Sequence, residues 1–149
     1  LRVMQSFFEH APQDAWLVFR QHPHSRGGPG HRQFVMSFAR ELGLGHRVHY
    51  LVESATPSLA QHAAGVVVIN STVGLQTLER GAPLKVLGQA IYDRPGLTFQ
   101  GDLSQFWTNA QPGNRPTVDQ FLHQLKALTQ VPVSLYAFAD EPLPWDSMP

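Results

Sequence analysis

The chain has 149 residues, of which 42% are hydrophobic and 15% are charged, and its formal net charge is zero with histidine neutral. This length and apolar content are sufficient for one domain with a hydrophobic core. The charge balance excludes a strongly basic surface for general nucleic-acid binding. The absence of cysteine excludes disulfides, Cys-ligated zinc and a thiol nucleophile.

The beginning of the chain shows no signal-peptide pattern, and no apolar run approaches the ~20 residues that a membrane span needs. The lack of such a run leads us to expect a soluble segment. Since the first residue is Leu1 and not Met, we also expect this segment to be cut from a longer protein. A cytoplasmic location agrees with the lack of cysteine.

The predicted elements alternate between helices and strands. Periodicity and turn residues predict helices at 2–10, 31–42, 57–63, 73–80 and 117–130, a helical turn at 102–107, strands at 16–19, 47–52, 66–69 and 84–87, and loops at 21–30 and 88–101. A capping box of Thr117 and Gln120 is expected to begin the last helix. The alternation predicts an α/β fold, a parallel sheet with helices on both faces, over residues 1–138, followed by an extended tail at 139–149.

Polar residues gather where the strand at 66–69 ends and the next helix begins. The Val/Ile run of this strand is typical of a strand buried on both faces. Ser71 and Thr72 follow it, and the unpaired N–H groups of a helix start can bind an anion. Gly74 is expected to leave room for a ligand. The residues alone leave a second interpretation open, in which Ser71 or Thr72 only caps the helix.

Four segments of the chain carry a resemblance to a known family. They read FRQHP at 19–23, INSTVGL at 69–75, RGAP at 80–83 and LGQAIYDRPGLT at 87–98. In this order they resemble the capsule polysaccharide biosynthesis/export family, whose characterised members are bacterial β-Kdo transferases that build the lipid-linked Kdo linker of capsules. The likeness runs from about Trp16 to Trp107.

The resemblance implies a fold, a reaction and a set of partners. It implies the Rossmann-like C-terminal half of a GT-B glycosyltransferase, which binds the donor CMP-Kdo without a metal or other cofactor. The partners implied are the donor, a lipid or Kdo-terminated acceptor and the protein's own N-terminal domain, with peripheral association at the cytoplasmic face of the inner membrane. The acidic catalytic groups are expected in the N-terminal half, so no catalytic residue is assigned here.

The resemblance also implies roles for individual residues. Ligands of parallel sheets collect outside the carboxyl ends of the strands, so one crevice could hold both polar motifs. By similarity, His22 of the His22-Pro23 motif binds the CMP phosphate, and Ser71 and Thr72 bind the same phosphate. Arg20 is expected to help neutralise the charge of the donor.

Other residues of these segments have two open interpretations. Gln76 is a candidate for the ribose or an exposed helical glutamine, and Arg26 is either near the donor or a solvated surface residue. Tyr92 and Asp93 are assigned to the rim of the site, although an Asp in a loop often serves a turn.

Other classes of function can be compared with the transferase on the same sequence. The spacing of the eight histidines fits no familiar metal motif, and neither GxxxxGK[ST] nor GxSxG occurs. A non-catalytic nucleotide- or glycan-binding module in capsule assembly and export stays open beside the transferase. The face that would meet the N-terminal half could also pair two copies of the fragment.

Overall fold

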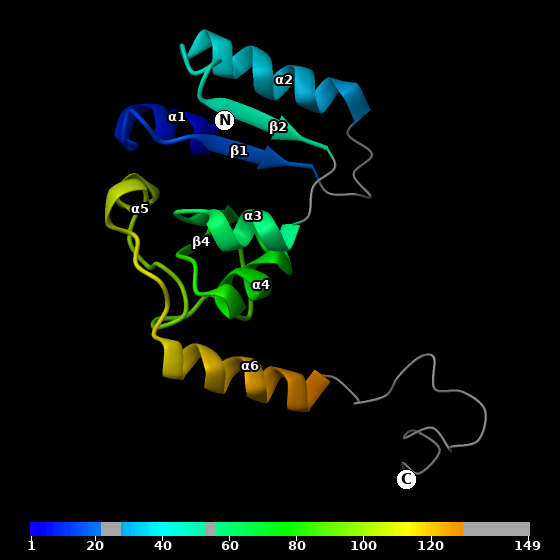
Figure 1. The fold of residues 1–149 in the computed structure, drawn as a ribbon, viewed down its shortest axis with the longest axis vertical. Helices are drawn as coiled ribbons and strands as arrows, with labels where there is room; N and C mark the ends of the chain where they lie inside the picture. The colour runs from blue at the N-terminus through cyan, green and yellow to red at the C-terminus, as the bar shows by residue number, and fades with distance from the viewer. Residues whose placement is uncertain (22–27, 53–55, 130–149) are drawn as a thin grey trace, which may run out of the picture.

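The computed structural model describes residues 1–21, 28–52 and 56–129 (Figure 1). In these ranges short parallel strands alternate with helices, which places the chain in the α/β class as predicted. Nearly every predicted element is found within a few residues of its expected position, because apolar periodicity and turn residues are local signals.

The first half of the chain contains two strands and two helices. Its elements are α1 (Arg2–His10), β1 (Leu17–Arg20), α2 (Gly28–Glu41) and β2 (Val48–Leu51). The strands are parallel, with a register that runs from Leu17 opposite Val48 to Arg20 opposite Leu51. The N–H of Gln21 donates to the Leu51 carbonyl at 2.9 Å, so the ladder continues one residue beyond β1.

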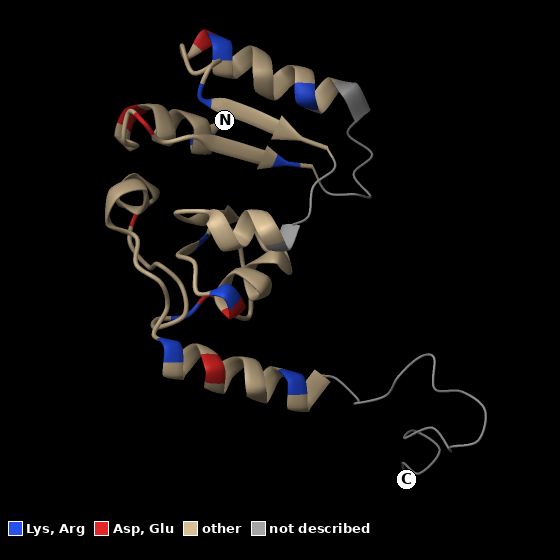
Figure 2. Ribbon diagram, viewed as in Figure 1, with Lys and Arg blue, Asp and Glu red and all other residues tan. Residues whose placement is uncertain are grey.

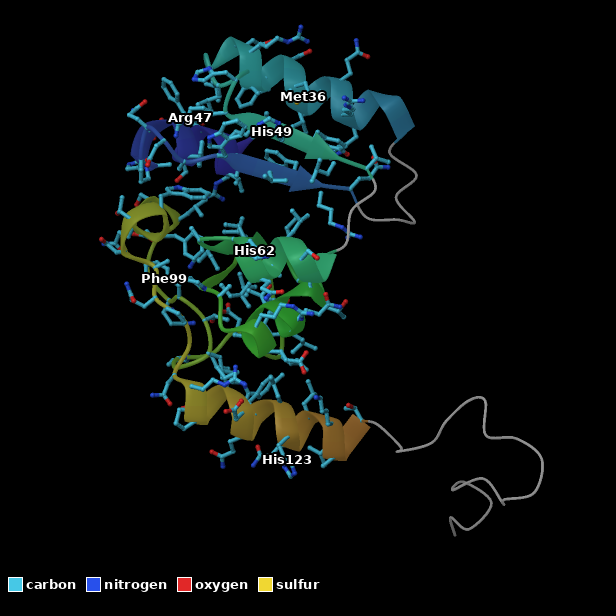
Figure 3. The ribbon with its side chains drawn as sticks, in the orientation of Figure 1. Met36, Arg47, His49, His62, Phe99 and His123 are labelled. Atoms are coloured by element: carbon cyan, nitrogen blue, oxygen red, sulfur yellow. The ribbon has the colours of Figure 1, made fainter. Side chains whose placement is uncertain are left out.

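A buried apolar cluster holds this half together. We call it the N-terminal cluster, and it consists of Met4, Phe7, Ala11, Val35, Ala39, Leu44, Val48 and Tyr50. Arg47 is also buried, and its Nε donates to the Ala15 carbonyl at 2.9 Å while the guanidinium lies 4.9 Å from the centre of the Phe7 ring (Figure 3). Carbonyl partners and an aromatic face make this buried charge tolerable.

The second half repeats the strand–helix pattern. Its elements are α3 (Thr56–His62), β3 (Val66–Val68), α4 (Val73–Arg80), β4 (Leu84–Val86), α5 (Leu103–Asn109) and α6 (Arg115–Thr129). The strands β3 and β4 are parallel, with Val66 opposite Leu84 and Val68 opposite Val86. Gly81 ends α4 with φ of 74°, the left-handed conformation that glycine adopts easily. The C-terminal cluster consists of Val68, Leu78, Leu84, Val86, Tyr92, Leu97 and Val118.

Helix α5 connects the two halves. It packs against α1, where the Trp107 indole N–H donates to the Ser6 hydroxyl at 2.9 Å. The Trp107 ring also meets Phe7 edge-on at 5.3 Å between centroids. On the other side, Phe106 packs edge-on against Phe99 at 5.6 Å. This helix therefore contacts α1 at the beginning of the chain and the loop that follows β4.

The prediction of one parallel sheet with helices on both faces is wrong for the described residues. They contain two separate two-stranded sheets, β1–β2 and β3–β4. Burial alternates along the first sheet, since Val48 and Tyr50 are buried while Val18 and His49 are exposed. Such alternation means that helices cover one face of this sheet. The prediction of a single sheet failed because a sequence pattern does not show which strand edges pair.

Three element boundaries also differ from the prediction. Helix α2 begins at Gly28, so the connection after β1 is shorter than the predicted loop at 21–30. The 102–107 turn is part of the longer helix α5, and α6 begins two residues before Thr117. The tail at 139–149 lies outside the described residues. Among the helices that are described, none has the length and apolar content that crossing a bilayer requires.

Charged side chains are distributed over both halves. In the view of Figure 2, Lys and Arg are interspersed with Asp and Glu and do not form one continuous basic face. On α6, Arg115 pairs with Asp119 one turn later at 2.6 Å, and Lys126 reaches Glu79 of α4 at 3.4 Å. The first pair lies within α6 and the second joins α6 to α4, and exposed pairs of this kind add little stability.

Candidate functional site

The junction between β3 and α4 forms a tight turn that uses its own hydrogen bonds. Ser71 Oγ accepts the N–H of Val73 at 3.2 Å, and the Ser71 carbonyl accepts the N–H of Gly74 at 2.9 Å. The N–H of Leu75 donates to the Thr72 carbonyl at 3.0 Å. The prediction that these first-turn N–H groups are free for an anion is therefore wrong, because a turn with short-range bonds has already paired them.

The hydroxyl groups are the donors that this turn leaves for a ligand. Ser71 Oγ uses a lone pair to accept from Val73, and its own hydrogen can still donate. Ser71 thus bonds to the first N–H of α4, as the capping interpretation expects, and this bond does not exclude a ligand. Thr72 is exposed and its side chain makes no capping bond to α4. Two hydroxyls therefore lie at the carboxyl end of β3, where ligands of parallel sheets bind.

Tyr92, which we expected at the rim of the site, is buried against this turn. Its side chain is only 3% exposed, and its O–H donates to the Ser71 carbonyl at 2.5 Å. A Cβ at Gly74 would lie 2.5 Å from the Tyr92 ring. The ring thus fills the space that Gly74 was expected to leave for a ligand. Burial raises the pKa of Tyr92 above its ordinary value, and the negative charge of the neighbouring Asp93 adds a smaller effect in the same direction. The O–H therefore stays a donor.

Asp93 is held within its own loop. Its Oδ1 accepts from the Thr98 hydroxyl at 2.7 Å and from the Gln100 side-chain amide at 3.3 Å. Lys85 of β4 fixes the end of the same loop by donating to the Gly101 carbonyl at 2.7 Å. These bonds agree with the interpretation of Asp93 as a residue that serves a turn, and Lys85 is a supporting residue that no sequence pattern selected.

The remaining candidates lie further from this turn or cannot be placed. Gln76 is exposed on α4, which both of its interpretations require. Arg20 ends β1 in the other sheet, and its buried Nε has no hydrogen-bond partner among the described residues. His22, Pro23 and Arg26 lie outside the described residues. The structure therefore brings Ser71, Thr72, Gly74 and Tyr92 together, and it does not show them in one crevice with the end of β1.

A second polar group, at the carboxyl end of the β1–β2 sheet, was missed from the sequence. His31 Nδ1 lies 2.6 Å from the Tyr50 hydroxyl, and this hydroxyl donates to Gln21 Oε1 at 3.2 Å. The three residues come from α2, β2 and the end of β1, so no spacing in the sequence links them. Their only local signal is that Gln21 immediately precedes the His22-Pro23 motif.

These features define an α/β chain with polar side chains at the carboxyl ends of its parallel strands. The comparisons with known proteins then give the family. Residues 1–136 match the family model described as capsule polysaccharide biosynthesis protein. The chain belongs to this family, as the resemblance in its sequence predicted.

Two relatives illustrate the relationship. The chain is 40% identical over 134 residues to the capsule polysaccharide export protein KpsS of Escherichia coli, which covers 90% of this chain and 34% of that protein. It is 36% identical over 138 residues to the capsule polysaccharide modification protein LipB of Neisseria meningitidis serogroup A, covering 92% of this chain and 33% of LipB. The chain thus spans about a third of the length of each. No solved structure matches it.

Proposed function

We propose that the chain is the donor-binding part of a capsule glycosyltransferase and that its donor is CMP-Kdo. Membership of the capsule polysaccharide biosynthesis family supports a role in making this polysaccharide. The observation that carries the proposal is the pair of hydroxyls of Ser71 and Thr72 at the carboxyl end of β3, at the place where α/β folds bind nucleotides.

The chemistry of this turn suits a phosphodiester. The Ser71 and Thr72 hydroxyls can each donate a hydrogen bond to a phosphate oxygen, and bonds to a charged group contribute about 1.5–3 kcal/mol each. The carbonyl of Ser71 accepts from the buried Tyr92 and from Gly74, so the backbone that carries Ser71 is held in place. In our proposal His22 adds a donor to the same phosphate, and Arg20 offsets the negative charge of the donor.

The rest of the reaction belongs to the whole protein. In the GT-B arrangement that we propose, the other half of the enzyme supplies the acceptor side and the acidic catalytic groups, and the transfer needs no metal. The acceptor is a lipid or a Kdo-terminated glycan at the cytoplasmic face of the inner membrane. Transferase activity is compatible with a relative whose name refers to capsule modification.

Calorimetric titration with CMP tests the proposed binding. We expect the purified chain to bind CMP more tightly than UMP, because the base is part of the donor. Ser71→Ala and His22→Ala should each weaken CMP binding by roughly tenfold or more, which corresponds to one lost hydrogen bond to a charged group.

Two matched variants control for general effects of substitution. Thr108 on α5 and His123 on α6 are both exposed and distant from the β3–α4 turn, and His123 points away from the sheets in Figure 3. Thr108→Ala and His123→Ala should leave CMP binding unchanged. Binding of CMP that Ser71→Ala does not weaken would contradict the site. If the folded chain binds no nucleotide and the full-length protein transfers no Kdo, the results favour the non-catalytic module.

A further inference from the structure

Gln21, Tyr50 and His31 form a chain of hydrogen bonds outside the β3–α4 turn. Tyr50 lies in the middle, on β2, and its side chain is only 8% exposed. Its hydroxyl contacts His31 Nδ1 at 2.6 Å and Gln21 Oε1 at 3.2 Å. The rings of His31 and Tyr50 meet edge-on with centroids 5.6 Å apart. Two fixed contacts and the ring packing therefore determine how the His31 imidazole is oriented.

The hydrogen-bond directions of this chain assign a tautomer to His31. A phenol has one hydrogen to donate, and Gln21 Oε1, which can only accept, takes it from Tyr50. In this arrangement the contact of Tyr50 with His31 uses the hydrogen of the imidazole, so we place the proton on Nδ1. In a neutral imidazole the other nitrogen, Nε2, is then an acceptor. Among the described residues no group donates to Nε2, and the side chain of His31 is exposed.

We propose that this chain is a positioning device that presents His31 Nε2 as a hydrogen-bond acceptor for a hydroxyl group of the ligand. The site lies at the carboxyl end of the β1–β2 sheet, since Gln21 directly follows β1 and His31 lies in the first turn of α2. Such an acceptor binds a ligand group that carries a hydrogen, as a hydroxyl does, and not an ionised phosphate oxygen. The inference rests on the proposed function for the nature of the ligand, in which either the ribose or the sugar supplies the hydroxyl.

Nitrogen-15 NMR of the imidazole groups tests the tautomer directly. In the wild-type chain we expect the proton of His31 on Nδ1 and an unprotonated Nε2. Tyr50→Phe removes the hydroxyl but keeps the buried ring, so the proton should redistribute toward Nε2. A purely structural role for Tyr50 would not change the His31 tautomer. Proton attachment at Nε2 in the wild-type chain would overturn the proposal.

Three ligands distinguish the sources of the hydroxyl. A shift of the His31 Nε2 resonance with CMP but not with 2′,3′-dideoxy-CMP would assign it to the ribose. A shift with free Kdo would assign it to the sugar. For the ligand that shifts the resonance, His31→Ala should weaken binding roughly three- to tenfold, the range for one hydrogen bond, whereas His123→Ala should have no effect.

Calorimetry with the same samples separates the two proposals. If CMP binds but none of the three ligands moves the Nε2 resonance, the hydroxyl site is refuted and the proposed function stands. If CMP does not bind while Kdo moves the resonance, nucleotide binding is refuted and the hydroxyl site stands. An Nε2 resonance that no ligand moves, in a chain that binds nothing, would refute both.

Discussion

Single residues at the β3–α4 turn act through close packing. Gly74 is buried against the aromatic ring of Tyr92, which lies in a loop 18 positions further along the chain. The missing side chain lets Tyr92 reach the Ser71 carbonyl, which the Tyr92 O–H holds in place. A glycine that could be explained by ligand access is therefore explained by the approach of a buried tyrosine.

Gly74→Ala tests this packing. The added Cβ would lie 2.5 Å from Cε2, Cζ and Oη of Tyr92, and so the ring or the helix must move. Alanine favours the helix over glycine by up to ~1 kcal/mol, but overpacking at a buried site costs about 1–3 kcal/mol. We expect a net loss of stability of about 1–2 kcal/mol in urea denaturation.

Gly30→Ala is the matched control for this substitution. Gly30 also lies in a helix, α2, but a Cβ there would meet no atom of the described residues within 4 Å. This variant should be as stable as the wild-type chain or more stable by up to ~1 kcal/mol. Equal stabilities of the two variants would show that Tyr92 does not constrain Gly74.

Among the elements, α6 shows how the start of a helix depends on a single side chain. Asn114 Oδ1 accepts the Thr117 N–H at 3.2 Å and the Thr117 hydroxyl at 2.9 Å. The predicted capping box of Thr117 and Gln120 is therefore wrong, because Thr117 lies inside the helix and donates to Asn114. An asparagine just before a helix is a strong capping residue, and it takes precedence here.

Asn114→Ala should destabilise the chain by about 1 kcal/mol, since it leaves a donor at the start of α6 without its partner. Gln120→Ala is the control, because Gln120 is exposed on the same helix and its loss should change stability by less than ~0.5 kcal/mol. Thermal denaturation followed by circular dichroism measures both. If Gln120→Ala lowered the stability and Asn114→Ala did not, the result would support the predicted capping box instead.

At the scale of the whole molecule, α5 links the beginning of the chain to its second half. Trp107 contacts Ser6, which is 101 positions earlier, and Phe106 packs on Phe99. Contacts at this sequence separation carry a large loop-closure cost, which the packing of α5 on α1 must offset. The N-terminal cluster is thereby joined, through a short helix, to the loop that follows β4.

A double-mutant cycle measures this link. Ser6→Ala and Trp107→Phe each remove the same hydrogen bond, so together they should cost less than the sum of the single variants by about 1 kcal/mol. Ser6→Ala with Trp16→Phe is the control cycle, because Trp16 is 63% exposed and stacks on His49. That pair should be additive. Additivity of Ser6 with Trp107 would show that the α1–α5 contact contributes no stability.

Local patterns in the sequence predicted the order and type of the elements and the family. Apolar periodicity in α1, the Val/Ile run of β3 and the glycine after α4 are local signals, since each depends on the 3.6- or two-residue period or on one backbone conformation. The motif segments predicted the family, which the match over residues 1–136 confirmed. The position of Ser71 and Thr72 at the end of β3 was predicted in the same way.

How these elements meet depends on tertiary packing, which no local pattern predicted. This packing separated the strands into two sheets, placed Tyr92 against Gly74 and joined Gln21, Tyr50 and His31 into one chain of hydrogen bonds. Each of these contacts joins residues that no local period relates. Their formation depends on how strand edges, loops and side-chain volumes fit together after the elements pack, which is why the sequence pattern indicated the polar strand ends but not the residues that support them.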